Sequence, residues 1–234
     1  MTTPKIDIKQ IEAELSREPN LDNIVRAIDA YLEQSDTRSL EKALSLVLRN
    51  MEKYEKEPAF LFRTMQVLAL IKDNADAAKL AGTLAYRLIE LEPNQAKWYV
   101  NAAYIHWRLG NLATAIELSE VGLNRLERIS APTDIIAALK ANLAYYYAQR
   151  GLPENAEQAR RLAAEAYNTK ATASHADTLG YVLLRFATNR TDLEKAIKYL
   201  KEAQAEIERL RLNNPFVIEH LSEAETRLRE KMSG

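Results

Sequence analysis

Stretches that mix apolar and charged residues alternate with short breaks along the whole chain, and the prolines fall mostly in the breaks. Six glycines and seven prolines occur among 234 residues, while Ala, Leu, Glu, Lys and Arg, all good helix formers, dominate. A protein built from many short strands would need more turn residues than this. The pattern therefore predicts long helices joined by short turns.

Several helix ends can be placed from local signals. Pro153 and Pro215 each suit the first turn of a helix, where a missing N–H has no cost. Thr191 with Glu194 predicts a capping box at another helix start. Towards the end of the chain, one apolar stripe lies opposite a charged helix face and consists of Phe216, Val217, Leu221, Ala224 and Leu228. A half-polar terminal helix of this kind closes the last interface of a repeat array.

A repeat becomes visible when residues 96–110, 137–151 and 173–187 are aligned without gaps. The eighth place of each segment is small (Ala103, Ala144 and Gly180), and so is the fifteenth (Gly110, Gly151 and Ala187). Two antiparallel helices can cross closely only where side chains are small, and a glycine after the first helix takes the left-handed conformation that ends it. A fainter copy begins at Phe62, 34 residues before Ala96. The repeated unit is therefore a helix pair.

These features resemble the tetratricopeptide repeat (TPR) family, in which paired helices have small residues at their crossing and glycine in their turn. The resemblance extends from Phe62 to about Leu228, and Leu21–Glu33 with Arg38–Tyr54 is interpreted as a further, poorly matching pair. It implies an all-α fold, a right-handed superhelical α-solenoid of about six antiparallel helix pairs. We expect one continuous array, with degenerate repeats over residues 1–58, TPR-like repeats over 59–214 and a capping helix over 215–234.

Charge and composition limit the kinds of partner that we expect and the cellular compartment in which we expect the protein. Lys and Arg (32) nearly balance Asp and Glu (33), and the two signs interleave along nearly every predicted helix. Nucleic-acid-binding proteins concentrate positive charge, because phosphate neutralisation supplies much of their affinity, so we do not expect a nucleic-acid partner. The chain has no cysteine, no secretion signal in its first ten residues and no apolar run of membrane-spanning length. We expect no membrane insertion and a cytoplasmic protein, with a mature periplasmic form as the alternative.

The polar residues form no recognisable catalytic pattern. His106, His175 and His220 lie on different predicted repeats and lack the spacing of a metal-binding pair. Ser174, His175 and Asp177 lie so close together on one helix that their side chains point in different directions. We therefore expect no enzyme activity, no metal and no cofactor, and we expect His106 in the core.

In the TPR family the first helix of each pair lines the concave side of the array, which commonly binds an extended peptide or a helix of a partner. Asn101 and Asn142 share one place in successive repeats, where peptide-binding members use an Asn to hydrogen-bond the ligand backbone. Thr178 and His220 occupy this place in the next two repeats. The expected partner-binding residues are Lys97, Asn101, Tyr104, Trp107, Arg108, Asn142, Tyr145, Gln149, Tyr181 and Arg185.

The side chains of this groove indicate what it binds. Tyr and Trp offer large contact areas with few rotatable bonds, and Arg binds carboxylates in a planar geometry. Because Lys97 and Lys140 add positive charge against the single Asp177, we expect a partner segment with acidic and apolar residues. Core positions are expected at Trp98, Tyr99 and Tyr147. Periodicity leaves the three repeated tyrosines open between core and groove.

Two other functions stay open. The array could self-associate as a homo-oligomer, its groove receiving a terminal helix of a second copy such as Phe216–Met232 or Ile6–Leu15. A helical-repeat RNA-binding protein would stack bases on its tyrosines, although the near-zero net charge argues against it. Binding of an acidic chaperone tail is disfavoured, because Val100 stands where such members of the family have a lysine.

Overall fold

In a computed structural model of the chain, the described residues are 7–34, 36–71, 74–212 and 214–233, and every regular element within them is a helix. The α-helices are α1 (Ile8–Arg17), α2 (Leu21–Gln34), α3 (Thr37–Asn50), α4 (Pro58–Leu70), α5 (Ala75–Leu91), α6 (Ala96–Arg108), α7 (Leu112–Arg128), α8 (Thr133–Arg150), α9 (Ala156–Thr169), α10 (Ala173–Arg185), α11 (Arg190–Arg209) and α12 (Pro215–Ser233). A short 3₁₀ helix, η1 (Pro153–Asn155), precedes α9. The twelve α-helices of these ranges confirm the expected all-α fold of about six pairs.

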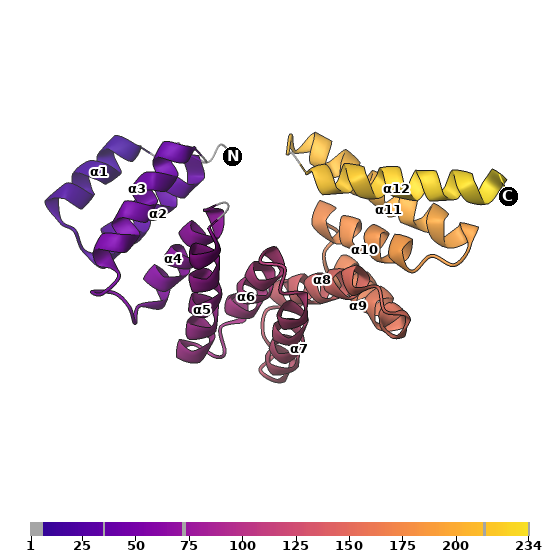
Figure 1. The fold of residues 1–234 in the computed structure, drawn as a ribbon, viewed down its shortest axis with the longest axis horizontal. Helices are drawn as coiled ribbons and strands as arrows, with labels where there is room; N and C mark the ends of the chain where they lie inside the picture. The colour runs from indigo at the N-terminus through magenta and orange to yellow at the C-terminus, as the bar shows by residue number, and fades with distance from the viewer. Residues whose placement is uncertain (1–6, 35, 72–73, 213, 234) are drawn as a thin grey trace. The chain divides into compact units, whose positions relative to one another are not determined.

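The chain divides into two compact units, residues 1–93 and residues 94–234. In the first unit α2 packs against α1, α3 and α4, and α4 packs against α3 and α5. In the second unit each helix packs against the next. In addition, α8 packs against α6 and α10, and α10 packs against α12 (Figure 1). Stacked helix pairs of this kind define an α-solenoid. The three-part division expected at residues 58 and 214 stays a prediction.

The core of the first unit is built from apolar side chains of α2, α3 and α4. Its fully buried members include Ile24, Ile28, Val47 and Phe60. Asp29 of α2 accepts two hydrogen bonds from the guanidinium of Arg63 on α4, each 2.8 Å long. Two parallel hydrogen bonds hold the relative orientation of both groups, so this pair fixes α4 against α2.

One helix end in this unit differs from the expectation. α3 ends at Asn50 rather than at Tyr54, and residues 51–56 form turns. The ring of Tyr54 nevertheless packs 5.7 Å from that of Phe60, measured between centroids. An apolar side chain that enters the core from a turn can fall on the helical period by chance, which explains the error. Ile6, the expected start of the first segment, lies outside the described residues, and α1 begins at Ile8.

Helix pairs of the second unit cross at small residues, as the repeat predicts. The residues at the eighth place, Ala103, Ala144 and Gly180, are all buried. A Cβ on Gly180 of α10 would lie 2.6 Å from Cγ of Leu200 on α11. A Cβ on Gly122 of α7, which the repeat pattern did not single out, would lie 2.7 Å from Cβ of Tyr99 on α6. The absence of a side chain therefore sets the distance between the helices at both crossings.

The turns after α6 and α8 adopt the glycine conformation that the sequence predicts. Gly110 has φ +76° and Gly151 has φ +70°, both in the left-handed region. After α6 the N–H of Gly110 donates to the carbonyl of Trp107 at 2.9 Å, and the N–H of Asn111 donates to the carbonyl of His106 at 2.9 Å. These bonds satisfy carbonyls that the helix itself leaves without partners.

Two other helices end in the left-handed region without a glycine, at Ser130 after α7 (φ 51°) and at Arg211 after α11 (φ 54°). A residue with a side chain adopts this region at a cost of about 1–2 kcal/mol, which glycine avoids. Glycine also has more conformational freedom in the unfolded chain, and this offsets about 0.4–1 kcal/mol of that gain. Arg211→Gly is therefore expected to raise the free energy of unfolding by about 0.5–1 kcal/mol in urea denaturation. Leu210→Gly is the control, because Leu210 has a φ of −85° and glycine relieves no strain there. An equal gain in the control would contradict the explanation.

The start of α11 differs from the expected capping box. The side chain of Asn189 caps this helix, its Oδ1 accepting a hydrogen bond from the N–H of Asp192 at 3.0 Å. Thr191 lies inside the first turn, so the prediction of a box with Glu194 is wrong. Asn and Thr have similar capping chemistry, and only the extended backbone at Asn189 (φ −141°, ψ 173°) decides between them.

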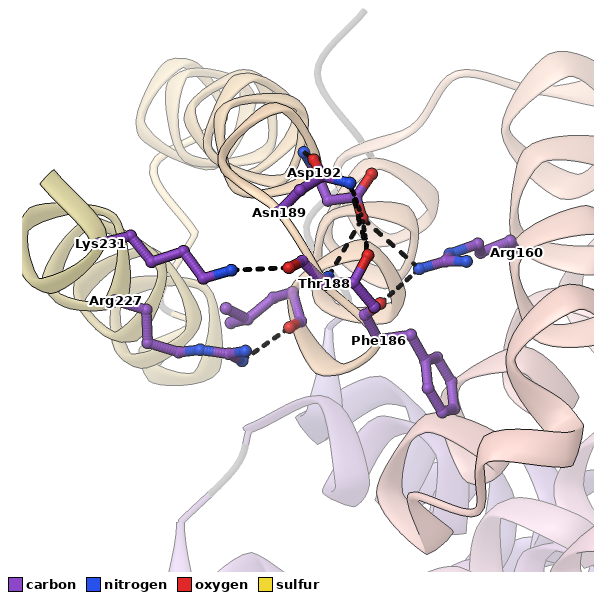
Figure 2. Close-up of polar contacts among 8 residues, drawn as sticks. Arg160, Phe186, Thr188, Asn189, Asp192, Arg227 and Lys231 are labelled. Atoms are coloured by element: carbon purple, nitrogen blue, oxygen red, sulfur yellow. Dashed lines mark hydrogen bonds and ion pairs between the residues drawn. The ribbon is translucent and has the colours of Figure 1, made fainter. Parts of the chain in front are cut away.

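Basic side chains from two other helices bind the carbonyl groups at the end of α10 and in the turn that follows (Figure 2). Arg227 of α12 donates to the carbonyl of Leu184 at 2.7 Å. Lys231 of α12 donates to the carbonyl of Thr188 at 2.6 Å, and Arg160 of α9 donates to the carbonyl of Phe186. The last carbonyls of a helix lack intrahelical partners and carry partial negative charge, so cations are favoured there. These contacts attach α12 to the α10–α11 hairpin.

The apolar stripe of α12 is narrower than the sequence indicated. Val217 and Ala224 are buried, and Leu221 and Leu228 are half-buried against the rest of the unit. Phe216, expected in the same stripe, is 49% exposed. Adjacent residues of a helix point about 100° apart, so Phe216 cannot share the buried direction of Val217.

Candidate partner-binding face

Helices α6, α8, α10 and α12 lie next to one another in the second unit. The ten residues predicted to bind a partner all lie on the first three of these helices. We define the first-helix face as these ten residues together with Asp177, Glu219, His220 and Glu223. The structure therefore gathers the predicted residues in one unit and adds a fourth helix beside them.

An aromatic row crosses this face from α6 to α12. The ring centroids are 5.6 Å apart between Tyr104 and Trp107 and 5.7 Å apart between Trp107 and Tyr145. The row continues from Tyr145 to Tyr181 at 4.8 Å and from Tyr181 to the stacked ring of His220 at 4.2 Å. Contacts of this length are favourable for aromatic pairs, so the row also holds the four helices together.

Exposure falls steadily along the aromatic row. Tyr104 on α6 is 44% exposed, Tyr145 on α8 is half-buried, and Tyr181 on α10 is 9% exposed. The three tyrosines occupy the same place in their repeats, and only their neighbours in space make them different. The expected core residues Trp98, Tyr99 and Tyr147 are buried, as predicted. The end of the row at α6 is therefore the end most available to a partner.

Two polar side chains brace the row. The indole Nε1–H of Trp107 donates to Oε1 of Gln149 at 2.6 Å, and Nε2–H of Gln149 donates to the hydroxyl of Tyr145 at 3.3 Å. Arg108 lies over the ring of Tyr104 and donates to its hydroxyl at 3.3 Å. Gln149 thus connects α6 to α8 and keeps two rings in place, a positioning role that the sequence did not reveal.

The two repeated asparagines differ in their own hydrogen bonds. Nδ2 of Asn101 donates to the carbonyl of Lys97 on the same helix at 2.7 Å. The amide of Asn142 is half-buried and forms no hydrogen bond with any residue that the structure describes. The Asn142 amide can therefore bind a peptide group, which needs both a donor and an acceptor.

A buried histidine–aspartate pair connects α10 to α12. Nδ1 of His220 lies 2.8 Å from Oδ1 of Asp177, and the two residues are 7% and 8% exposed. Asp177 is therefore already bound and does not oppose the positive charges of the face as expected. The two residues are 43 positions apart in the chain. In the sequence, the one sign that His220 belongs to this face was that it occupies the place in its repeat that Asn101 occupies in its own.

Two other groupings read from the sequence separate in the structure. Nδ1 of His175 lies 2.7 Å from the carbonyl of Lys170, whereas Asp177 is bound to His220, so Ser174, His175 and Asp177 form no chain of contacts. Lys140 pairs with Glu165 of α9 at 2.8 Å and with Glu127 of α7 at 3.3 Å. The hydrogen bond from Lys140 lowers the pKa of Glu165, and this pair draws Lys140 away from the expected groove charge.

No protein-family model matches the chain, and no curated protein sequence matches it at a significant level. Several solved structures are similar. The thermophilic TPR protein TTC0263 of Thermus thermophilus has a TM-score of 0.61 at 14% identity, covering 85% of this chain and 97% of its own. PilW, a widely conserved type IV pilus biogenesis factor, has a TM-score of 0.63 at 13% identity, covering 92% and 95%. MamA has a TM-score of 0.55 at 13% identity, covering 80% and 92%.

The chain has a TPR-type fold. In TPR terms, α6, α8, α10 and α12 are first helices of successive repeats, and the first-helix face joins equivalent sides of all four. Within the described residues of this TPR array, no helix is long and apolar enough to cross a membrane. The same residues contain no cluster of His, Cys, Asp and Glu that is arranged to hold a metal ion.

Burial and nearby charge set the protonation of Tyr145 and Tyr181. Burial, followed by the proximity of Tyr181, Asp177 and Glu219, raises the pKa of Tyr145 to about 12. Burial also raises the pKa of Tyr181, with Arg185 acting against the shift and Glu223 acting with it. Both hydroxyls therefore stay protonated and neutral at physiological pH. The charges named here also show that α12 lies close to the aromatic row.

Proposed function

We propose that this TPR-type protein binds a segment of another protein on its first-helix face. The observation that carries the proposal is the half-buried, unpaired amide of Asn142 beside an aromatic row whose α6 end is open to solvent. Tyrosine and tryptophan supply large contact areas at a small cost in side-chain entropy, and they are enriched where proteins bind one another. This combination favours a peptide ligand over a flat protein surface.

The positions of the asparagines support an extended backbone as the ligand. Asn101 and Asn142 stand at the same place on α6 and α8, helices that pack side by side. An amide side chain can donate to a peptide carbonyl and accept from a peptide N–H at once. Two such amides on neighbouring helices would bind successive parts of one strand, while Tyr104 and Tyr145 contact its side chains.

Selection from a library of short random peptides tests this proposal. Peptides enriched on the native chain are expected to bind an Asn101→Ala/Asn142→Ala variant about tenfold more weakly, because each lost amide removes hydrogen bonds to the ligand. The matched control is Asn124→Ala, which removes an exposed amide from α7, away from the first helices. Circular dichroism and urea denaturation of each variant exclude unfolding as the cause. Equal affinity for the native chain and the double variant would overturn the proposal.

Exposed apolar residues favour self-association as a second candidate function. Leu210 and Leu212 follow α11 in the chain, Phe216 and Ile218 lie in the first turn of α12, and all four are exposed. Apolar surface that stays exposed in a soluble protein often marks an interaction site. Sedimentation over a range of concentrations decides, because self-association raises the mass above the 26.6 kDa of one chain. A constant mass of one chain would remove this candidate.

A further inference from the structure

The exposed cations of the first-helix face lie on α6 and α10, and its exposed carboxylates lie on α12. Lys97 and Arg108 lie on α6 and Arg185 at the end of α10, all exposed and without an ion pair to any described carboxylate. Glu219 and Glu223 lie exposed on α12, and Arg227 lies 3.8 Å from Glu223. Arg227 keeps its positive charge while it donates to the carbonyl of Leu184, so it offsets one of the carboxylates on α12.

Helix α12 continues the face with a different chemistry. Pro215 begins α12 as Ala96 begins α6, so Glu223 holds the place of Tyr104 in its repeat. A carboxylate therefore stands where the three preceding repeats each have a tyrosine. The stacking of His220 on Tyr181 shows that this side of α12 adjoins the aromatic row.

An open surface hollow of about 540 Å³ lies along α12, and all of its lining residues belong to this helix. Its lining includes three carboxylates (Glu219, Glu223 and Glu230), one cation (Arg227) and the exposed side chain of Ile218. Carboxylates around an apolar side chain suit a lysine or arginine, whose methylene stem packs on the apolar part while its charge meets the acids.

We propose that the partner segment carries opposite charges at its two ends, with acidic residues over α6, apolar residues over Tyr145 and basic residues over α12. This inference rests on the proposed function and specifies its ligand. It replaces the acidic and apolar segment expected from the sequence, because an acidic residue over Glu219 and Glu223 would be repelled. Complementary charges at both ends would also fix the direction in which the segment lies across the four helices.

Peptides enriched from the random library provide the first test. They are expected to carry acidic residues towards one terminus, apolar residues in the middle and basic residues towards the other, in one common direction. Their affinity should fall with salt, since exposed charges are screened. Enrichment of peptides with charges of only one sign would overturn this inference and leave the proposed function standing. Failure to enrich any peptide would count against both.

Charge reversal provides the second test. A Glu219→Lys/Glu223→Lys variant is expected to bind an enriched bipolar peptide about tenfold more weakly and to regain affinity when the basic residues of that peptide become acidic. The matched control is Glu117→Lys/Glu157→Lys, which reverses two exposed carboxylates on α7 and α9. Unchanged binding by the α12 variant would overturn the inference. Loss of binding only in the Asn101→Ala/Asn142→Ala variant would keep the proposed function alone.

Discussion

Replacing His220 with alanine is expected to lower the free energy of unfolding by about 3 kcal/mol, because a buried ionic group that loses its partner bears its full desolvation cost. Asp177 is 8% exposed, and its Oδ1 lies 2.8 Å from Nδ1 of His220. The substitution also removes the ring that stacks on Tyr181 at 4.2 Å. Since the pair connects α10 to α12, the loss should destabilise the second unit.

Urea denaturation followed by tryptophan fluorescence measures this effect in the second unit. Both tryptophans of the chain, Trp98 and Trp107, lie on α6 of that unit. The control is the double variant Asp177→Ala/His220→Ala, which removes the carboxylate together with its partner. It is expected to cost clearly less than the sum of the two single variants, the sign of a direct interaction. Additive single effects, or a loss below about 1 kcal/mol for His220→Ala, would contradict the assigned role.

Gly122→Ala is expected to lower the free energy of unfolding by about 2 kcal/mol, although alanine is the better helix former. The new methyl group would lie 2.7 Å from Cβ and 2.8 Å from Cγ of Tyr99. Tyr99 is almost fully buried, and these atoms belong to the stem of its side chain, so they cannot turn away. Helices α6 and α7 would have to separate instead, at a cost larger than the gain of about 1 kcal/mol in helix propensity.

The same denaturation measurement tests this substitution. Asn124→Ala serves as the control, because Asn124 lies two residues further along α7 and is exposed. Its replacement should leave stability within about 0.5 kcal/mol, as exposed helix positions usually do. If Gly122→Ala also left stability unchanged, or raised it, the close crossing of α6 and α7 would not be what requires glycine here.

The candidate site shows how far sequence reasoning reaches. The repeat alignment predicts that Tyr104, Tyr145 and Tyr181 are equivalent, and the structure places all three in one aromatic row. Their different exposures were not predictable, because exposure depends on how completely the next helix covers each ring. The contribution of α12 was missed for a similar reason. The alignment does place His220 at the position of Asn101, but Glu223 breaks the tyrosine pattern, so the aromatic repeat does not extend to this helix.

Some helix ends are predictable from local sequence, and others are not. The left-handed glycines after α6 and α8 follow from residues within one turn of the helix end. At the start of α11, Asn189 and Thr191 offer similar capping groups two residues apart, and local sequence cannot choose between them. At the end of α10, donors come from α9 and α12, as far as 43 residues away.

The sequence by itself determined the helices, their pairing, the small residues at their crossings and the glycine turns, because these depend on conformational preferences and on spacings within a few turns of chain. Tertiary structure alone decided which tyrosines are exposed, that Asp177 meets His220, that Lys140 turns towards α7 and α9, and that Phe216 faces solvent. Helical periodicity states which residues share a direction on one helix. It does not state what stands opposite them, and burial, ion pairing and the available binding surface all depend on that neighbour.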